Sequence, residues 1–290
     1  MPNRSIVGLV HHPSLPEAKR LVSSLVTDLA LQDRCWVSSP ATIDESGGTL
    51  DDTSMIITAG GDGTILQTVR AAAPHHVPIL GINMGRVGFM TELTVEDAIG
   101  KIPSYLAGNA RVEERMMLQA SVTSPQRTEP FLTVHALNDI VVSRGQTGLL
   151  DVEVEVDGAC LYTYRADGLI IATPTGSTGY ALSAGGPIVY PEASTVQIQP
   201  VAAHLSFQSG IIVSGDSTVG LKMAPQYEAV LTVDGFAHTT LGPDDIVTVQ
   251  RSPHVTRFLR NTSPAEFYSR LTARLSVGRG PAVSSGAGGG

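Results

Sequence analysis

The sequence predicts a two-part protein: an α/β region with a parallel sheet, followed by a region built almost entirely of β-strands. Three observations lead to this fold class. The first third of the chain alternates short apolar runs with amphipathic helical stretches, whereas later segments alternate apolar and charged residues. In addition, 290 residues are many for one hydrophobic core and sufficient for two.

The α/β region is predicted from its apolar runs. Strands are expected at residues 5–10, 35–37, 55–58 and 77–82, and helices at 17–30 and 65–73. In the first helix, Ala18, Leu21 and Leu25 recur at helical spacing. Because the strands are continuous apolar runs without a polar face, they suit a parallel sheet that helices cover on both sides.

The β-rich region is predicted from alternation and turn residues. Apolar and acidic residues alternate at 150–156, the pattern of a strand with one wet face, and Asp157-Gly158 then supplies a hairpin turn. Further strands are expected at 118–123, 140–142, 159–164, 169–172, 195–199, 210–213, 218–223, 229–233 and 246–251. Short strands at this spacing indicate an antiparallel sandwich or layered sheet.

The predicted boundary between the regions lies near residue 115. We expect an α/β domain at 1–115 and a β-rich domain at 116–262. A last helix at 263–276, with Ser263 as its N-cap, is expected to return to the first domain. The small residues of 281–290 predict a disordered tail.

Composition restricts the possible partners and location. Acidic residues exceed basic ones, for a formal net charge of −8, so the surface should repel nucleic acid and anionic lipid. No apolar run approaches the roughly 20 residues of a membrane-spanning helix, and the N-terminus lacks a signal-peptide pattern. We therefore expect a cytoplasmic protein. Cys35 and Cys160 match no metal-ligand spacing and are expected to be buried thiols.

A glycine loop, TAGGDGT at 58–64, follows the third predicted strand and precedes a helix. Glycines let a phosphate approach the backbone, and a helix N-terminus favours negative charge. An aspartate in that position would repel the phosphate unless it had a function. Asp62 is therefore either a turn residue, a Mg²⁺ ligand or an acceptor of a hydroxyl proton, and Thr64 can cap the helix.

Further polar and glycine-rich segments follow other predicted strands. The loop 81–89 should lie beside the first loop, where Arg86 could reach phosphate and Phe89 could line a pocket. Asn138-Asp139 precedes a strand and reads as a turn or as a nucleotide contact. The stretch 165–191 is rich in hydroxyl groups and glycine. It is either a loop that wraps ribose and phosphate or an irregular crossover segment without a ligand. The sequence contains no Walker A motif, GxGxxG fingerprint or HExxH motif.

Together these segments resemble the NAD kinase family, which phosphorylates the adenosine ribose 2′-hydroxyl of NAD to make NADP. The resemblance rests on GGDGT (60–64), LGINMGRVGF (80–89), the Glu-Arg of EERMML (113–118), ALNDIVVSRG (136–145) and, most specifically, DGLIIATPTGSTGYALSAGGPIVYP (167–191). It covers most of the chain. One departure is Phe236 after Asp234-Gly235, where bacterial relatives often have a polar residue.

The resemblance implies the roles of individual residues. Asp62 would be the catalytic proton acceptor, with Gly61 and Gly63 beside the bound phosphates. Asn138 and Asp139 would bind adenine and ribose. The remaining dinucleotide contacts would come from Arg165, Asp167, Thr178, Gly179, Tyr180, Ala181, Leu182, Ser183 and Ala202. The resemblance also implies an enzyme that uses Mg²⁺ or another divalent cation, takes ATP or polyphosphate as donor, and forms a homodimer or homotetramer.

Two other functions remain open at this point. A lipid kinase acting on diacylglycerol or a sphingoid base has a similar glycine loop, but it predicts an apolar cleft and an affinity for membranes. A non-catalytic NAD or NADP sensor would bind the same ligand and would leave Asp62 without a task. No dedicated metal-binding residues are predicted from the sequence.

Overall fold

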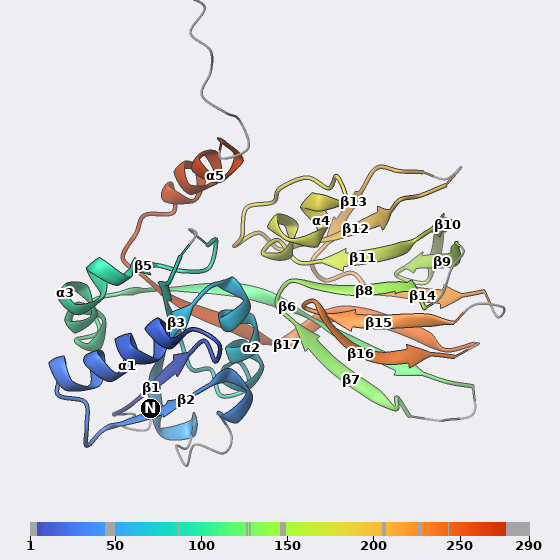
Figure 1. Ribbon diagram of the computed structural model, residues 1–290. Helices are drawn as coiled ribbons and strands as arrows, with labels where there is room; N and C mark the ends of the chain where they lie inside the picture. The colour runs from blue at the N-terminus through green and yellow to red at the C-terminus, as the bar shows by residue number, and fades with distance from the viewer. Residues whose placement is uncertain are drawn as a thin grey trace, which may run out of the picture.

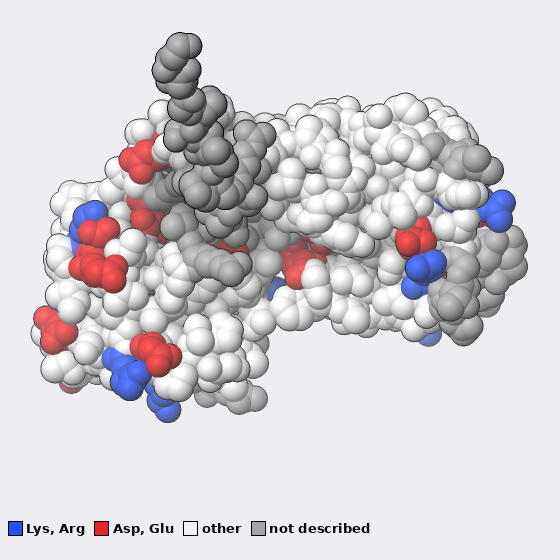
Figure 2. All heavy atoms as spheres, turned by 45° about the horizontal axis from the view of Figure 1, so that its top comes forward, with Lys and Arg blue, Asp and Glu red and all other residues white. Residues whose placement is uncertain are grey.

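The computed structural model describes residues 5–43, 50–85, 88–125, 127, 129–145, 149–204, 207–224, 228–242 and 244–276. The molecule has two lobes joined by long strands (Figure 1), and a space-filling view shows that it narrows between them (Figure 2). Within the described residues, no helix is both long and apolar enough to cross a bilayer.

The first lobe is an α/β unit. Its elements are β1 (Ile6–His11), α1 (Pro16–Asp28), β2 (Cys35–Ser38), β3 (Thr53–Gly60), α2 (Asp62–Ala72), β4 (Ile79–Asn83), β5 (Leu93–Thr94) and α3 (Val95–Leu106), with single 3-10 turns at Pro40–Thr42 and Leu50–Asp52. The strands pair in parallel in the order β5, β4, β3, β1, β2. The predicted parallel sheet is confirmed. Helix α3 was not predicted, since Gly100 and Pro103 obscure its pattern.

The second lobe is an antiparallel β-sandwich. Its own strands are β7 (Leu132–Ala136), β8 (Asp139–Arg144), β9 (Leu150–Val156), β10 (Ala159–Ala166), β11 (Gly168–Ala172), β12 (Thr195–Val201), β13 (Ile211–Ser214), β14 (Val219–Met223), β15 (Ala229–Val233) and β16 (Phe236–Leu241). One layer has the order β13, β12, β11, β8, β15, β16. Its buried Val142 and Leu169 share a core with Val154 and Leu221 of the other layer. The predicted sandwich is confirmed.

Two long strands, β6 (Arg111–Thr123) and β17 (Ile246–Arg260), connect the lobes. They pair with each other along their whole lengths, and β17 also pairs in parallel with β4, so the sheet of the first lobe continues into one layer of the sandwich. Both strands are longer than expected, because their charged ends looked too polar to be buried. Strand β6 crosses residue 115 without interruption, and the domain division there stays a prediction.

The charged ends of these strands form a buried ionic cluster of Glu92, Glu113, Arg115 and Arg260. Arg260 lies 3.3 Å from both glutamates, and Arg115 lies 2.7 Å from Glu113. None of the four residues is more than 9% exposed. Burial alone would raise the pKa of Glu113, but Arg115 and Arg260 outweigh it and hold that pKa below its usual value. The cluster therefore keeps its charges while holding β5, β6 and β17 together.

The last helix, α5 (Glu266–Ser276), begins later than predicted. The Ser263 N–H donates to Glu266 Oε1 at 3.3 Å, and the Glu266 N–H donates to the Ser263 carbonyl at 3.0 Å, while the role of Ser263 as the N-cap stays a prediction. The Phe267 ring lies 6.4 Å from that of Phe89 and 5.8 Å from that of Tyr190, so the helix contacts both lobes. The predicted tail at 281–290 lies outside the described residues. Cys160 is exposed, contrary to expectation, and Cys35 is partly buried.

Replacing Gly8 with alanine should destabilise the first lobe. The two residues Gly8 and Trp36 face each other across β1 and β2, and a Cβ at position 8 would overlap the indole ring, which donates a hydrogen bond to Thr53. We expect Gly8→Ala to lower the free energy of unfolding by about 1–3 kcal/mol. Urea denaturation measures this. The control is Gly100→Ala, because that helical position has open space and alanine there should stabilise by roughly 0.5–1 kcal/mol. Unchanged unfolding of Gly8→Ala would contradict the account.

Candidate functional site

Asp62 lies at the start of α2, directly after the end of β3. Its two carboxylate oxygens accept hydrogen bonds from the backbone N–H groups of Phe89, at 3.0 Å, and Met90, at 3.1 Å. A Cβ at Gly88 would overlap Asp62 Oδ1, so only glycine allows the chain to pass this close. Thr64 does not cap the helix, as its hydroxyl has no partner in the described structure and the cap position is Gly61.

The two glycine loops lie side by side at the carboxyl edge of the parallel sheet, as predicted. Gly60 is paired with Asn83 across β3 and β4, and the Met84 N–H donates to the Gly60 carbonyl at 3.3 Å. The chain then returns over Asp62 at residues 88–90. Arg86, which was considered as a phosphate ligand, lies outside the described residues. Gly63 is exposed, with open space around its Cα.

In the second lobe, Asn138 and Asp139 are fixed by Asp234. The Asp234 carboxylate accepts three backbone N–H groups, those of Leu137 at 3.0 Å, Asn138 at 2.7 Å and Asp139 at 3.2 Å. Asp234 lies in the turn between β15 and β16 with a φ of 51°, and Gly235 follows with a φ of 80°. Asp234 is not among the site residues predicted from the sequence. The Asp-Gly pair marks the turn, but the contact with residues 137–139 joins segments far apart in sequence.

Asp139 and Asp234 form a buried pair of acids. Burial, and then the neighbouring Asp234 carboxylate, raise the pKa of Asp139 to about 7. Burial also raises the pKa of Asp234, although the three N–H groups and Arg70 oppose that rise. Asp139 therefore changes its charge near neutral pH.

The hydroxyl-rich loop after β11 packs directly on Asn138. The Thr173 hydroxyl donates to the Leu137 carbonyl at 2.6 Å, and the Thr173 N–H donates to the Asn138 carbonyl at 2.9 Å. Gly176 fits against the same carbonyl, where a Cβ would overlap the Asn138 backbone. This contact requires glycine and carries the chain on to Gly179 and Tyr180.

These segments enclose an open cleft of about 400 Å³, within the range of small-molecule sites. The residues that line it are Asn138, Asp139, Val141, Ser143, Tyr180, Thr232, Asp234 and Gly235. Tyr180 is 47% exposed, so its ring face is available. The Asn138 Oδ1 atom is buried and has no partner in the described structure. A buried acceptor of this kind costs free energy until it is paired, which is a property of ligand-binding residues.

The other residues implied by the resemblance occupy different places. Thr178 donates its hydroxyl to the Thr175 carbonyl, Ala181 is fully buried, and Leu182 and Ser183 lie in the short helix Tyr180–Ser183, which we label α4. Ala202 has a φ of 48°.

Arg165 lies 3.9 Å from Asp151, and Asp167 lies 3.0 Å from Arg144. Arg165 and Asp167 lie before the first residue of β11, whereas Asp139 pairs with the last residue of that strand. Asp139 lines the cleft, but Arg165 and Asp167 do not.

Helix α2 also contacts the turn that holds Asp234. Arg70, near the end of this helix, donates to the Val233 carbonyl at 3.4 Å, and its guanidinium lies 4.8 Å from the centre of the Phe236 ring. The helix that begins at Asp62 is thus tied to the hairpin that fixes Asn138 and Asp139. Phe236, the departure noted in the sequence, supplies an aromatic face for Arg70 in place of a polar group.

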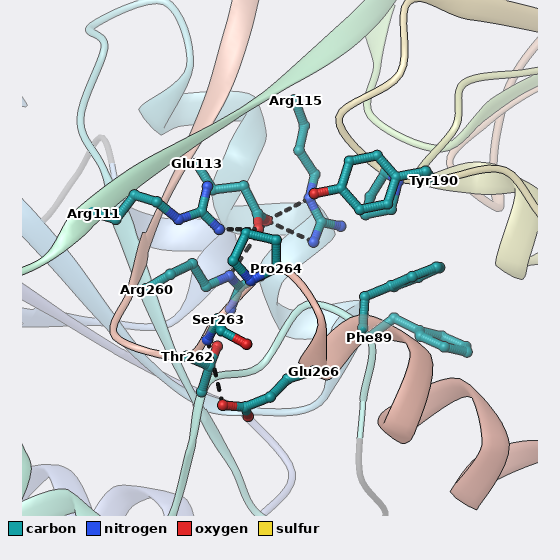
Figure 3. Close-up of a pocket in the computed structure, with 12 residues that line it drawn as sticks. Phe89, Arg111, Glu113, Arg115, Tyr190, Arg260, Thr262, Ser263, Pro264 and Glu266 are labelled. Carbon is teal, nitrogen blue, oxygen red and sulfur yellow. Dashed lines mark hydrogen bonds and ion pairs between the residues drawn. The ribbon is translucent and has the colours of Figure 1, made fainter.

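A second pocket is lined by Phe89, whose N–H binds Asp62 (Figure 3). Phe89, Tyr190 and Phe267 contribute aromatic rings to it, and Arg111, Glu113, Arg115 and Arg260 contribute charges. Asp62 attracts Arg115 electrostatically, opposing the fall in the pKa of Arg115 that burial causes. The described residues contain no group of three or more histidine, cysteine, aspartate or glutamate side chains in a metal-binding arrangement.

Comparison with known proteins identifies relatives of this chain. Residues 48–110 match the ATP-NAD kinase N-terminal domain, and residues 137–261 match the ATP-NAD kinase C-terminal domain. The NAD kinase of Dehalococcoides mccartyi (strain CBDB1) is 36% identical over 271 residues, which cover 93% of this chain and 95% of that protein.

Two solved structures share the fold. A yeast NADH kinase complexed with NADH has a TM-score of 0.85 and 23% identity, covering 98% of this chain and 91% of the other. An NAD kinase from Archaeoglobus fulgidus in complex with ATP has a TM-score of 0.72 and 25% identity, covering 92% and 99%. Both domain matches and the sequence identity over nearly the whole chain lead to one conclusion: the protein belongs to the NAD kinase family.

Proposed function

We propose that this protein transfers the terminal phosphate of ATP to the 2′-hydroxyl of the adenosine ribose of NAD, producing NADP. The observation that carries the proposal is the placement of Asp62. It is held by two backbone N–H groups at a helix N-terminus, on a helix tied to the hairpin of the Asn138 and Asp139 cleft. A carboxylate beside a phosphate loop, on a helix connected to a cleft that suits a sugar, fits the transfer of phosphate to a hydroxyl.

In this proposal the cleft of the second lobe binds the dinucleotide. Asn138 Oδ1, which has no partner among the described residues, accepts a hydrogen bond from a base amino group, and the Asp139 carboxylate accepts ribose hydroxyls. The exposed Tyr180 ring provides a stacking face. Gly179 and the backbone of 178–183 lie beside it. Arg165, Asp167 and Ala202 are proposed contacts at a greater distance from the cleft, on the strength of the family resemblance alone.

Asp62 orients the attacking hydroxyl and accepts its proton late in the reaction. A carboxylate is too weak a base to remove a sugar hydroxyl proton before attack. Phosphoryl transfer passes through a loose transition state, however, so the nucleophile mainly requires alignment, and alignment can supply roughly 7–11 kcal/mol of the barrier reduction. The hydrogen bonds from Phe89 and Met90 fix the carboxylate in the required position.

The donor phosphates are proposed to lie over Gly61 and Gly63, where open space and a helix N-terminus favour anions. The Archaeoglobus relative in complex with ATP supports ATP as the donor. A divalent cation such as Mg²⁺ would arrive with the phosphates and neutralise part of their charge. Such a cation requires only one or two carboxylates from the protein, which fits a chain whose described residues form no three-ligand cluster.

Further features of the proposal come from the family resemblance. Polyphosphate is an alternative donor, the protein is expected to act in the cytoplasm, and it is expected to form a homodimer or homotetramer.

The cleft at Asn138 and Asp139 contains two acids and an amide oxygen that has no partner among the described residues. Those polar groups disfavour the apolar substrate of a lipid kinase and favour a sugar.

The direct test is an assay of purified protein with NAD, ATP and Mg²⁺, in which NADP is detected with an NADP-specific dehydrogenase. NADP should accumulate, and separate reactions with polyphosphate or NADH define the donor and acceptor. Binding of NAD without formation of NADP under any donor would indicate the sensor function. Phosphorylation of diacylglycerol or sphingosine in place of NAD would indicate a lipid kinase.

Replacing Asp62 with asparagine should remove catalysis while preserving the fold. The amide keeps the size of the side chain, but it is not a proton acceptor, and only its oxygen can accept one of the two N–H groups of Phe89 and Met90. We expect kcat to fall by about 10²–10⁴, with NAD affinity close to that of the wild type, as measured by steady-state kinetics and titration calorimetry. Asp28→Asn, at the exposed end of α1, is the matched control and should change neither quantity. Turnover of Asp62→Asn close to the wild-type value would rule out the assigned role.

NAD affinity should depend on the charge of Asp139. The pKa of its carboxyl is raised to about 7, so the carboxylate form predominates only above neutral pH. If this carboxylate accepts ribose hydroxyls, the Kd of NAD in the absence of ATP should be about tenfold higher at pH 6 than at pH 8. Titration calorimetry across this range measures it. Asp139→Asn should bind NAD more weakly and without this pH dependence. If the Kd of NAD depended on pH equally in the wild type and in Asp139→Asn, a group other than Asp139 would be responsible.

A further inference from the structure

The segment that holds Asp62 is itself held by a residue from the other end of the chain. Residues 88–90 supply the two N–H groups that bind the Asp62 carboxylate. The next carbonyl, that of Met90, accepts a hydrogen bond from Arg260 Nη1 at 2.9 Å. Three successive peptide units thus connect the carboxylate of Asp62 with the guanidinium of Arg260.

Arg260 occupies a position from which it cannot easily move. It is 3% exposed, its Nη1 lies 3.3 Å from Glu92 Oε2 and its Nε lies 3.3 Å from Glu113 Oε1. Its guanidinium also lies 4.9 Å from the centre of the Phe258 ring on the same strand. A planar group with several donors in a fixed arrangement can satisfy these acceptors together, which a lysine ammonium cannot do with the same geometry.

Glu92 fixes the far end of the same segment. Its Oε1 accepts the N–H groups of Asn261, at 2.9 Å, and Thr262, at 3.0 Å, and the hydroxyl of Tyr105 at 3.2 Å. Its own N–H donates to the Gly81 carbonyl at 2.8 Å. The segment from 88 to 92 is therefore bound to Asp62 at one end, and at the other to Arg260 and the two residues that follow β17.

Arg260 is separated from the dinucleotide cleft. The residues that line the cleft at Asn138 and Asp139 do not include it, whereas it lines the pocket beside Phe89. In Figure 3 it lies beneath Pro264, on the side of Glu113 away from Tyr190. A change at Arg260 should consequently reach the reaction through Asp62, with little effect on how the dinucleotide is held.

We propose that Arg260 is a positioning residue for Asp62: by holding the Met90 carbonyl, it sets the orientation of the N–H groups that aim the carboxylate at the ribose hydroxyl. This inference rests on the proposed function, because it gives Arg260 a task only if Asp62 acts on the substrate. It also provides β17, which begins in the sandwich, with a direct connection to the reacting carboxylate in the first lobe.

The experiment compares Arg260→Lys with Arg257→Lys in the full chain. Both are arginines of β17, but Arg257 forms a partly exposed pair with Glu114 at 2.8 Å. We expect Arg260→Lys to lower kcat by about tenfold to a hundredfold, with the NAD KM changed less than about threefold, because misplacement of the carboxylate impairs alignment rather than binding. Arg257→Lys should retain wild-type kinetics. A wild-type kcat for Arg260→Lys would overturn the proposal.

A control variant must separate the effect of lower stability on kcat from the effect of a misplaced Asp62 carboxylate. Leu221→Ala removes a fully buried side chain from the sandwich core, and it should lower the melting temperature without lowering kcat at a temperature where the protein is folded. If Arg260→Lys does not fold, Glu92→Gln provides the second variant. Its amide keeps the size of the side chain but loses the charge that orients Arg260, and it should reduce kcat in the same direction.

The decisive comparison uses the Asp62→Asn background. If Arg260 acts through Asp62, Arg260→Lys should change the residual kcat of Asp62→Asn by less than about twofold. A full additional loss in that background would overturn the positioning role. Wild-type turnover of Asp62→Asn itself would instead refute the proposed function of Asp62, so the two failures are distinguishable.

Discussion

The arrangement of this protein depends on the buried ionic cluster of Glu92, Glu113, Arg115 and Arg260. Two long strands leave the sandwich, enter the α/β lobe and end in charged residues that would be too costly to bury singly. In the cluster they form ion pairs at 2.7–3.3 Å and retain their charges. Removing one member would take an ion-pair partner from each buried charge beside it, so the cluster strongly favours one arrangement of the strand ends.

In the candidate site, two aspartates are held by hydrogen bonds from backbone N–H groups. Asp62 accepts two N–H groups and Asp234 accepts three. Because the backbone N–H groups belong to segments distant in sequence, each carboxylate fixes a loop as much as the loop fixes the carboxylate. Asp62 gathers residues 88–90 above the sheet edge, and Asp234 gathers residues 137–139 at the cleft. Arg70 then connects the two assemblies.

The sequence predicts local elements well and distant contacts poorly. The apolar runs of β1, β3 and β4 and the alternation of β9 reveal strands directly, since burial determines those residues. The full lengths of β6 and β17 could not be predicted, because their charged ends are buried only as ion pairs with each other and with Glu92. Likewise, Asp62 and Asn138 stand out within glycine-rich motifs. Asp234 and Arg260 do not, because their importance arises from partners that are about 95 and 170 residues away.

The central claim is that the fold brings one carboxylate of the α/β lobe to a sugar bound by the sandwich lobe. A crystal structure of the protein with NAD and a non-hydrolysable ATP analogue tests it most directly. The account predicts the adenosine ribose 2′-hydroxyl within about 2.6–3.2 Å of an Asp62 oxygen, with the dinucleotide in contact with Asn138 and Asp139. A bound NAD whose 2′-hydroxyl points away from Asp62, or whose adenosine lies outside that cleft, would contradict it.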